Sequence, residues 1–257
     1  MGGPATSYGA TGMNFVIFGQ ARTGSSLFVT LLRSHPQVQC AGEILGYDFW
    51  PSGPGRLRGR AQRWLRQFPE PYLLWAASRR KKPVYGLKLL YSHAADPRRV
   101  LSFLLRRHWQ IIHIQRRCLF DLALSRSVAI KTGRFGKHPL PSGRHEPSIA
   151  ITPEEFAYQA GLCTRIRRGE LSAINGLPHI TVTYESDLLG EGDRNRICGA
   201  VFDALYLEPH LVSTTAERTW ERPYSEFTVN YAELELLMHS SQGLELQAAW
   251  DRLFEAA

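Results

Sequence analysis

A short stretch near the N-terminus combines the residue types that bind an anion. Residues 19–26 (GQARTGSS) lie between an apolar run, 15–18, and a segment with leucines at helical spacing. The apolar run predicts a short buried strand, and Ser25 and Ser26 then open a helix. A helix N-terminus offers free backbone amides and the positive end of the helix dipole. The stretch therefore predicts an anion site, with Arg22 as its strong base.

The glycine spacing resembles the nucleoside-triphosphate loop G-x-x-x-x-G-K-[ST], with one difference that matters for the ligand. Ser25 occupies the position of the lysine that reaches the β- and γ-phosphates, and the strong base lies earlier, at Arg22. Such a cradle suits a single 5′-phosphate that carries a transferable group better than a triphosphate with magnesium. The alternative is an ordinary strand-to-helix turn with a surface arginine.

Three further residues could do chemistry beside this anion site. Glu43 lies in a loop one helix length beyond the turn, Lys88 lies near the end of a predicted strand, 84–90, and His93 follows that strand. A strand-helix-loop unit can fold the loop over the carboxyl edge of a parallel sheet, where α/β proteins bind ligands. The alternatives are a solvated or capping Glu43, a Lys88 that reaches outward to solvent, and a surface His93.

A second anion site is predicted at the end of a third buried strand, 110–114. This strand leads into Gln115-Arg116-Arg117, and Ser125 follows Arg117 by two turns of a predicted helix. An arginine at a strand end and such a serine can bind one phosphate together, the arginine through bidentate charge-assisted bonds. A magnesium-dependent NTPase would place an aspartate at this strand end. Its replacement by arginines counts against a triphosphate.

Together, the two predicted phosphate sites resemble those of the sulfotransferases that use 3′-phosphoadenosine 5′-phosphosulfate (PAPS). In that family, the arginine and serine that match Arg117 and Ser125 hold the 3′-phosphate. The strand-loop-helix that holds the 5′-phosphosulfate matches Arg22, Thr23, Gly24, Ser25 and Ser26. The resemblance implies PAPS as co-substrate, 3′-phosphoadenosine 5′-phosphate (PAP) as product, and no metal.

The similarity is greatest to bacterial carbohydrate sulfotransferases of the nodulation-factor and trehalose type. Their HP-x-V turn, GE-L loop and A-x-x-TG run match residues 35–38, 42–45 and 129–133. The loop carboxylate that matches Glu43 acts as the catalytic base in those enzymes. The resemblance thus implies Glu43 as the base and a carbohydrate or glycolipid hydroxyl as the acceptor. Arg22 and Lys88 would hold the sulfuryl oxygens, and His93 is the next candidate for the base.

Some positions depart from this pattern, and some matches lie late in the chain. Cys118-Leu119 replaces an Asp-Pro pair, and Phe135 stands where relatives often have tryptophan, which bears on the acceptor class rather than on the nucleotide. The resemblance places Tyr184 beside the adenine as a stacking residue. It also implies a late basic segment that closes the 3′-phosphate site, for which Arg222 is the candidate.

Strands alternate with helical segments along the chain, which predicts an α/β fold. We expect a single P-loop-like domain, 14–257, whose mainly parallel central sheet is flanked by helices, after a disordered leader, 1–13, rich in small residues. The chain has 257 residues and a formal charge of +8, so it should attract anions generally.

The cysteines and the apolar runs bear on the compartment. The four cysteines are scattered without a C-x-x-C pair or zinc spacing, which predicts free thiols and a reducing, cytoplasmic environment. No run approaches the roughly 18 apolar residues of a membrane span.

Two alternative functions differ in their ligands. A degenerate P-loop kinase or NTPase would bind ATP with magnesium. A nucleic-acid-binding domain would gather basic and aromatic residues on one face. The arginines are dispersed and no recognition motif occurs, so no nucleic-acid partner is expected. The sequence leaves the oligomeric state and the exact acceptor open.

Overall fold

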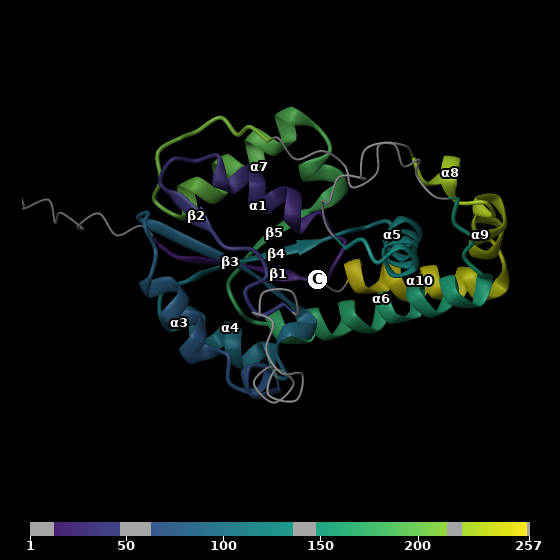
Figure 1. The fold of residues 1–257 in the computed structure, drawn as a ribbon, viewed down its shortest axis with the longest axis horizontal. Coiled ribbons are helices and arrows are strands. Elements are labelled where there is room, and N and C mark those ends of the chain that lie inside the picture. Colours follow the sequence, from purple (N-terminus) through teal and green to yellow (C-terminus); the bar gives the residue numbers. More distant parts are fainter. Residues whose placement is uncertain (1–12, 47–62, 136–147, 215–222, 256–257) are drawn as a thin grey trace, which may run out of the picture.

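A parallel sheet forms the centre of the left-hand part of the molecule (Figure 1). The computed structural model describes residues 13–46, 63–135, 148–214 and 223–255, and the sheet within these ranges has five strands. All neighbouring strands run parallel, in the order β2-β3-β1-β4-β5. The strands are β1 (Phe15–Gly19), β2 (Val38–Cys40), β3 (Val84–Leu90), β4 (Gln110–Gln115) and β5 (Ile180–Thr183).

Helices cover both faces of the sheet, as its apolar strands require. Successive residues of a strand point to opposite faces. Ile17 of β1 therefore packs in one core with α1 and α7, and Val16 packs in a second core with α3 and α4. These helices are α1 (Ser25–Arg33) and α7 (Glu191–Ala204) on one face, and α3 (Glu70–Ser78) and α4 (Pro97–Leu105) on the other (Figure 1).

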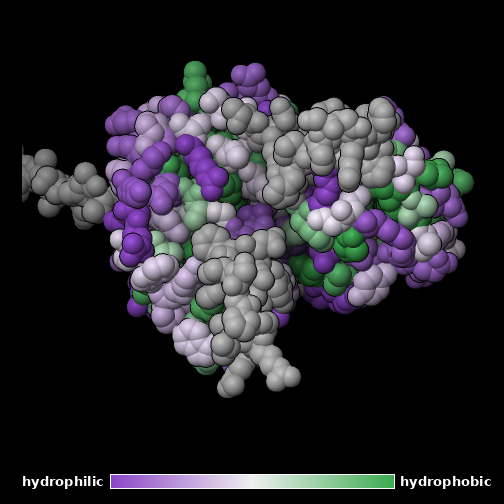
Figure 2. All heavy atoms as spheres, in the orientation of Figure 1, coloured by the Kyte–Doolittle hydropathy of each residue, from purple (hydrophilic) through white to green (hydrophobic). Residues whose placement is uncertain are grey.

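Other α-helices of the described ranges form a second part with its own core, on the right in Figure 1. The longest helix, α6, begins at a capping box in which Thr152 and Glu155 exchange hydrogen bonds of 3.2 and 3.0 Å. The helices of this part are α5 (Leu119–Thr132), α6 (Pro153–Ile174), α8 (Tyr224–Phe227), α9 (Tyr231–Met238) and α10 (Ser241–Glu255). Figure 2 shows the surface hollowed where the two parts meet, with hydrophilic residues in the hollow.

Two short helices follow strands directly at the carboxyl edge of the sheet: η2 (Tyr91–His93) after β3, and η3 (Tyr184–Leu188), one turn of π-helix, after β5. Single π-helical turns occur often at functional sites. The predicted α/β fold with a parallel central sheet flanked by helices is confirmed.

Several sequence predictions fall partly or wholly outside this description. Residues 1–12 of the predicted leader are not among the described residues, and the domain extent 14–257 stays a prediction.

All four cysteines carry free thiols. In the described ranges no helix is long and apolar enough to cross a membrane, and no cluster of His, Cys, Asp and Glu could hold a metal ion.

Candidate active site

The strand order places the two predicted phosphate sites next to each other at the carboxyl edge of the sheet. β1 lies between β3 and β4, and its last residue, Gly19, pairs with Leu90 of β3 and Ile114 of β4. The turn 20–24 leaves the carboxyl end of β1 and enters α1. Lys88 therefore lies on one side of the α1 N-terminus, and Arg117 follows the strand on the other side.

The turn itself has a conformation that favours glycine and is tightly packed. Arg22 and Gly24 have φ angles of 72° and 84°, in the left-handed region. A Cβ atom added to Gly24 would lie 2.4 Å from Cδ2 of Tyr184, so both the backbone and the space require glycine here. The Thr23 hydroxyl closes the turn by donating to the Gln20 carbonyl at 2.9 Å. Tyr184 thus lies directly against the predicted anion loop.

Glu43, Lys88 and His93 lie together at the end of β3. Lys88 Nζ lies 2.6 Å from Glu43 Oε1, and His93 Nε2 lies 3.5 Å from Glu43 Oε2. Lys88 Nζ also donates to Ser26 Oγ at 3.2 Å, which joins this group to the first turn of α1. The interpretations of Lys88 as an outward-reaching lysine and of His93 as a surface histidine are wrong, because these residues are only 5% and 8% exposed.

The backbone explains why a loop residue reaches a strand residue. After β2, the chain continues alongside β3: the Ala41 amide donates to the Gly86 carbonyl at 2.7 Å, and the Lys88 amide donates to the Gly42 carbonyl at 3.2 Å. Glu43 is the next residue, so the extended pairing places its side chain beside Lys88.

A backbone hydrogen bond also fixes the tautomer of His93, since its Nδ1 accepts from the Leu90 amide at 3.2 Å. The proton of a neutral His93 is then on Nε2 and faces Glu43.

The Glu43 carboxylate is strongly stabilised in its charged form. Burial raises its pKa, but the hydrogen bond from His93 and the charge of Lys88 outweigh burial and lower the pKa to about 2. A carboxylate held in this way is a weak base. The pKa of Glu43 will rise when Lys88 turns toward another anion, because the positive charge of Lys88 is then shared between Glu43 and that anion.

The second group of residues surrounds the hydroxyl of Ser125 on α5. Ser125 Oγ accepts hydrogen bonds from Arg22 Nε and from the Tyr224 hydroxyl, each at 2.9 Å. A serine oxygen has two lone pairs and one proton. With both lone pairs used, the hydroxyl proton is left to donate to a third group, which an anion can supply. Arg22 also donates to the Phe135 carbonyl at 2.9 Å.

The structure therefore places Arg22 differently from the role that the resemblance implies. Its guanidinium lies at Ser125, at the predicted 3′-phosphate end, and not beside Glu43 and Lys88. Arg117 and Ser125 are not joined directly, since the partners of Ser125 are Arg22 and Tyr224. The Arg117 guanidinium instead lies over the ring of Phe254, 5.7 Å from its centroid.

Arg116 lies against Tyr184 and the backbone of the anion loop, although sequence reasoning did not single it out. Its guanidinium lies 4.8 Å from the centroid of the Tyr184 ring, and one terminal nitrogen donates to the Arg22 carbonyl at 3.4 Å. The other donates to Asp121 Oδ2 at 3.1 Å. The signal available in the sequence was its place beside Arg117 at the end of a buried strand.

Two further residues of this end also escaped the sequence prediction. Glu185 accepts from the backbone amides of Arg117 and Cys118 at 2.8 and 2.9 Å, so it binds the turn that opens α5. Tyr224 lies in the late segment expected to close the 3′-phosphate site, but it is a phenol where a basic residue was expected. Arg222, the predicted residue, lies outside the described residues.

Comparisons of the sequence give no relative: no protein-family model matches the chain, and no curated protein matches it. Comparison with solved structures, in contrast, finds similar proteins. The sulfotransferase domain of the Synechococcus PCC 7002 olefin synthase aligns over 95% of this chain and 94% of that domain, with a TM-score of 0.54 and 12% identity. The chain shares the fold of a sulfotransferase domain.

A sulfotransferase from Alicyclobacillus acidocaldarius is also similar, over 93% of this chain and 98% of that one, with 17% identity and a TM-score of 0.45.

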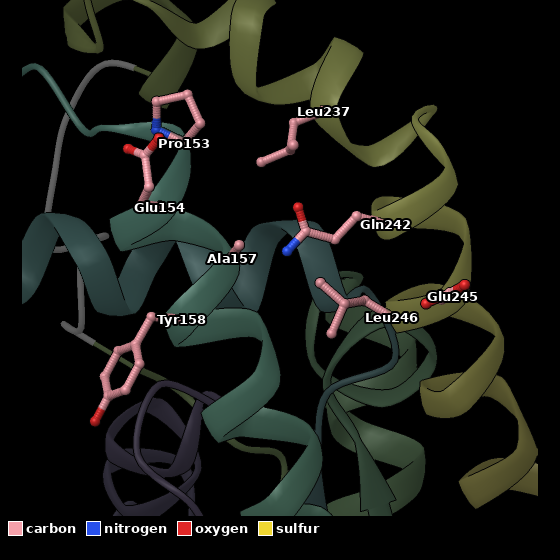
Figure 3. A pocket seen from close by; sticks show the side chains of 8 residues that line it. All are labelled: Pro153, Glu154, Ala157, Tyr158, Leu237, Gln242, Glu245 and Leu246. Atoms are coloured by element: carbon pink, nitrogen blue, oxygen red, sulfur yellow. The ribbon is translucent and has the colours of Figure 1, made fainter.

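A separate pocket of about 760 Å³ lies between α6, α9 and α10 (Figure 3). None of the predicted site residues lines it. Glu154 and Glu245 contribute carboxylates to its wall, and Leu237 and Leu246 contribute apolar surface. Acidic groups repel a nucleotide that carries several negative charges. This pocket therefore does not suit a ligand with several negative charges.

Proposed function

We propose that the protein is a sulfotransferase that moves the sulfuryl group of PAPS to a hydroxyl of a carbohydrate or glycolipid. The observation that carries this proposal is the pair of groups on either side of the α1 N-terminus. One group contains a carboxylate paired with a buried lysine, and the other is a serine hydroxyl with Arg22 and Tyr224 as its donors. The first suits proton removal and transfer, and the second suits a phosphate that is only bound.

The donor would span these two groups. Its 5′-phosphosulfate would lie at the amides and hydroxyls of Ser25 and Ser26, where the helix dipole and Lys88 stabilise negative charge. Its adenine would stack on Tyr184. Its 3′-phosphate would accept the Ser125 proton and bind Arg117.

In the reaction, the acceptor oxygen attacks sulfur and forms a new S–O bond. The S–O bond to the 5′-phosphate breaks in line with it, PAP leaves with the electron pair, and Glu43 takes the acceptor's proton. Lys88 leaves Glu43 for the departing phosphate, which both offsets the new charge and raises the basicity of Glu43. A general base typically contributes about 10²–10⁴-fold.

The acceptor class and the cellular location rest on different observations from the donor. A carbohydrate or glycolipid follows from the resemblance of residues 35–45 and 129–133 to bacterial carbohydrate sulfotransferases. The free thiols support a reducing, cytoplasmic location. No nucleic-acid partner is proposed.

Calorimetric titration of the wild type with PAP, and separately with ATP and magnesium, tests the proposal. We expect metal-independent binding of PAP and a loss of roughly 10–100-fold in affinity in Arg117→Ala, as for a lost charged hydrogen bond. A preference for ATP with magnesium, or the absence of any nucleotide binding, would overturn the proposed function.

A further inference from the structure

The peptide groups on both sides of Arg117 are held by residues far away in the chain. Its amide donates to Glu185 Oε2 at 2.8 Å, and its carbonyl accepts from the indole nitrogen of Trp250 at 2.6 Å. The ladder between β4 and β5 ends at the pair Gln115 and Thr183. The Arg117 carbonyl thus lies beyond the sheet, and Trp250 supplies the donor that the sheet does not.

Trp250 is fully buried in the core that α10 shares with α5 and α6. An indole N–H in such a place needs an acceptor, since leaving it unpaired costs about 1–3 kcal/mol. Here the acceptor is the backbone of the arginine that the sequence assigns to the 3′-phosphate. The burial of the ring and the position of Arg117 therefore depend on each other.

One helical turn later on α10, the ring of Phe254 carries two guanidinium groups. Arg117 lies 5.7 Å from its centroid and Arg167 lies 4.6 Å from it. Arg167 in turn donates to the Gln115 side chain at the end of β4 and lies 3.1 Å from Nε2 of His113. The last turns of α10 thus contact Arg117, just beyond the end of β4, through its carbonyl and its guanidinium, and Arg167 of α6 links Phe254 to the side chains of β4.

We propose that α10 positions the arginine of the 3′-phosphate site: Trp250 fixes the Arg117 backbone, and Phe254 supports its guanidinium. An arginine whose stem is already ordered loses less conformational freedom when it binds a phosphate. Trp250 and Phe254 therefore set the preference for a nucleotide that carries a 3′-phosphate, without touching the nucleotide. This inference rests on the proposed function, since it assumes that Arg117 binds that phosphate.

The test compares two nucleotides that differ only in the 3′-phosphate, PAP and adenosine 5′-phosphate. Trp250→Phe keeps the aromatic volume but removes the N–H donor. We expect it to lower the ratio of the two affinities by roughly three- to tenfold, the effect of one hydrogen bond. A purely structural role would lower thermal stability and weaken both nucleotides by the same factor, which would leave the ratio unchanged.

A second variant keeps the test decisive if Trp250→Phe does not fold. Phe254→Leu keeps an apolar side chain at a partly buried site and removes the ring face; the expected loss in the ratio is about two- to fivefold. Leu244→Ala, at an exposed position of the same helix, is the matched control and should not change the ratio. In an Arg117→Ala background, both variants should lose their effect on the ratio.

The outcomes separate the inference from the proposed function. If the wild type binds PAP no more tightly than adenosine 5′-phosphate, the proposed function fails at its 3′-phosphate site. If the wild type prefers PAP and the folded variants keep the full preference, the positioning role of α10 is wrong and the proposed function stands.

Discussion

The two ends of the proposed donor site are built in different ways. At the sulfuryl end, Glu43 follows β2, Lys88 lies on β3 and His93 follows β3, and the extended pairing of these neighbouring strands brings the side chains together. At the 3′-phosphate end, Ser125 meets Arg22 and Tyr224 across 103 and 99 residues. The sheet fixes the first end, whereas the second requires the helical part to pack against the sheet.

The two ends also differ in charge. The sulfuryl end holds a carboxylate, which opposes the binding of an anion but can remove a proton. Around Ser125, in the described part of the chain, the hydrogen-bond partners are a guanidinium and a phenol. We therefore expect substitutions at the sulfuryl end to change turnover, and substitutions at the other end to change affinity.

The sharpest test of this division is Glu43→Gln, with the largest expected effect. The amide keeps the size of the side chain but cannot take the proton, so turnover should fall by about 10²–10⁴-fold. PAP affinity should stay within a few-fold. PAP release with an acceptor that supports wild-type turnover measures the first, and calorimetry measures the second. Turnover within a few-fold of wild type would exclude Glu43 as the base and make His93→Asn the next variant.

Lys88→Met should also reduce turnover, by about 10²–10³-fold, as for loss of one group that stabilises developing charge. It has a second consequence, because Lys88 helps to hold the pKa of Glu43 at about 2. Without the lysine, the folded-state pKa of Glu43 rises toward its ordinary value, so Glu43 becomes protonated at a higher pH.

The rate-pH profile measures this shift. The acid side of the Lys88→Met profile should move to higher pH than in the wild type. A reduced rate with an unchanged profile would mean that Lys88 acts on the sulfuryl group alone and does not control the base.

A smaller effect is expected at the other end. Tyr224→Phe and Ser125→Ala should each weaken PAP binding by roughly three- to tenfold, because Ser125→Ala removes the hydroxyl proposed to donate to the 3′-phosphate and Tyr224→Phe removes one of the two donors that orient this hydroxyl. Adenosine 5′-phosphate should bind both variants as well as it binds the wild type. The double variant should lose little more than Ser125→Ala alone, since the two groups act together. Additive losses would show that Tyr224 acts independently of Ser125.

The difference between the ends also explains what could be predicted from the sequence. The alternation of apolar strands and amphipathic helices is local, and it gave the fold class correctly. The group of Glu43, Lys88 and His93 could be predicted from the sequence because its residues lie at or just after the ends of two such strands. A strand end or loop marks where a side chain must lie, even before its neighbours are known.

The contacts around Ser125 could not be obtained in this way. Nothing in the periodicity of residues 223–255 shows that Tyr224 contacts Ser125 and that Trp250 contacts Arg117, because that depends on how the helical part packs. The same limit explains why Arg22 was expected at the sulfuryl oxygens. Its left-handed φ of 72° and its hydrogen bond to Ser125 are properties of the folded turn.

The last effect is on stability rather than on turnover or affinity, and it concerns the buried cluster behind the 3′-phosphate end. Glu170 is fully buried, and among the described residues neither of its carboxylate oxygens has a hydrogen-bond partner; His113 Nε2 lies 3.8 Å from Oε2 and the Arg167 guanidinium lies 4.0 Å from it. Burial raises the pKa of Glu170 to about 8, against a smaller opposing influence of Arg167. The folded protein therefore binds a proton here that the unfolded chain has already released at neutral pH.

The sign of the pH effect follows from this difference. Between about pH 4.5 and pH 8 the folded state holds more protons at Glu170 than the unfolded state does, so this residue makes the wild type less stable as the pH rises. Glu170→Gln should therefore gain stability relative to the wild type over this window, at up to about 1.4 kcal/mol per pH unit.

Urea unfolding at pH 6 and pH 8 measures this difference in unfolding free energy, with Glu154→Gln on the exposed side of α6 as control. A constant difference between variant and wild type would mean that Glu170 is ionised in the fold, with its charge held by Arg167. Arg167, which lies over the ring of Phe254, would then form an ion pair with Glu170. Loss of this ion pair should also reduce the preference for PAP over adenosine 5′-phosphate.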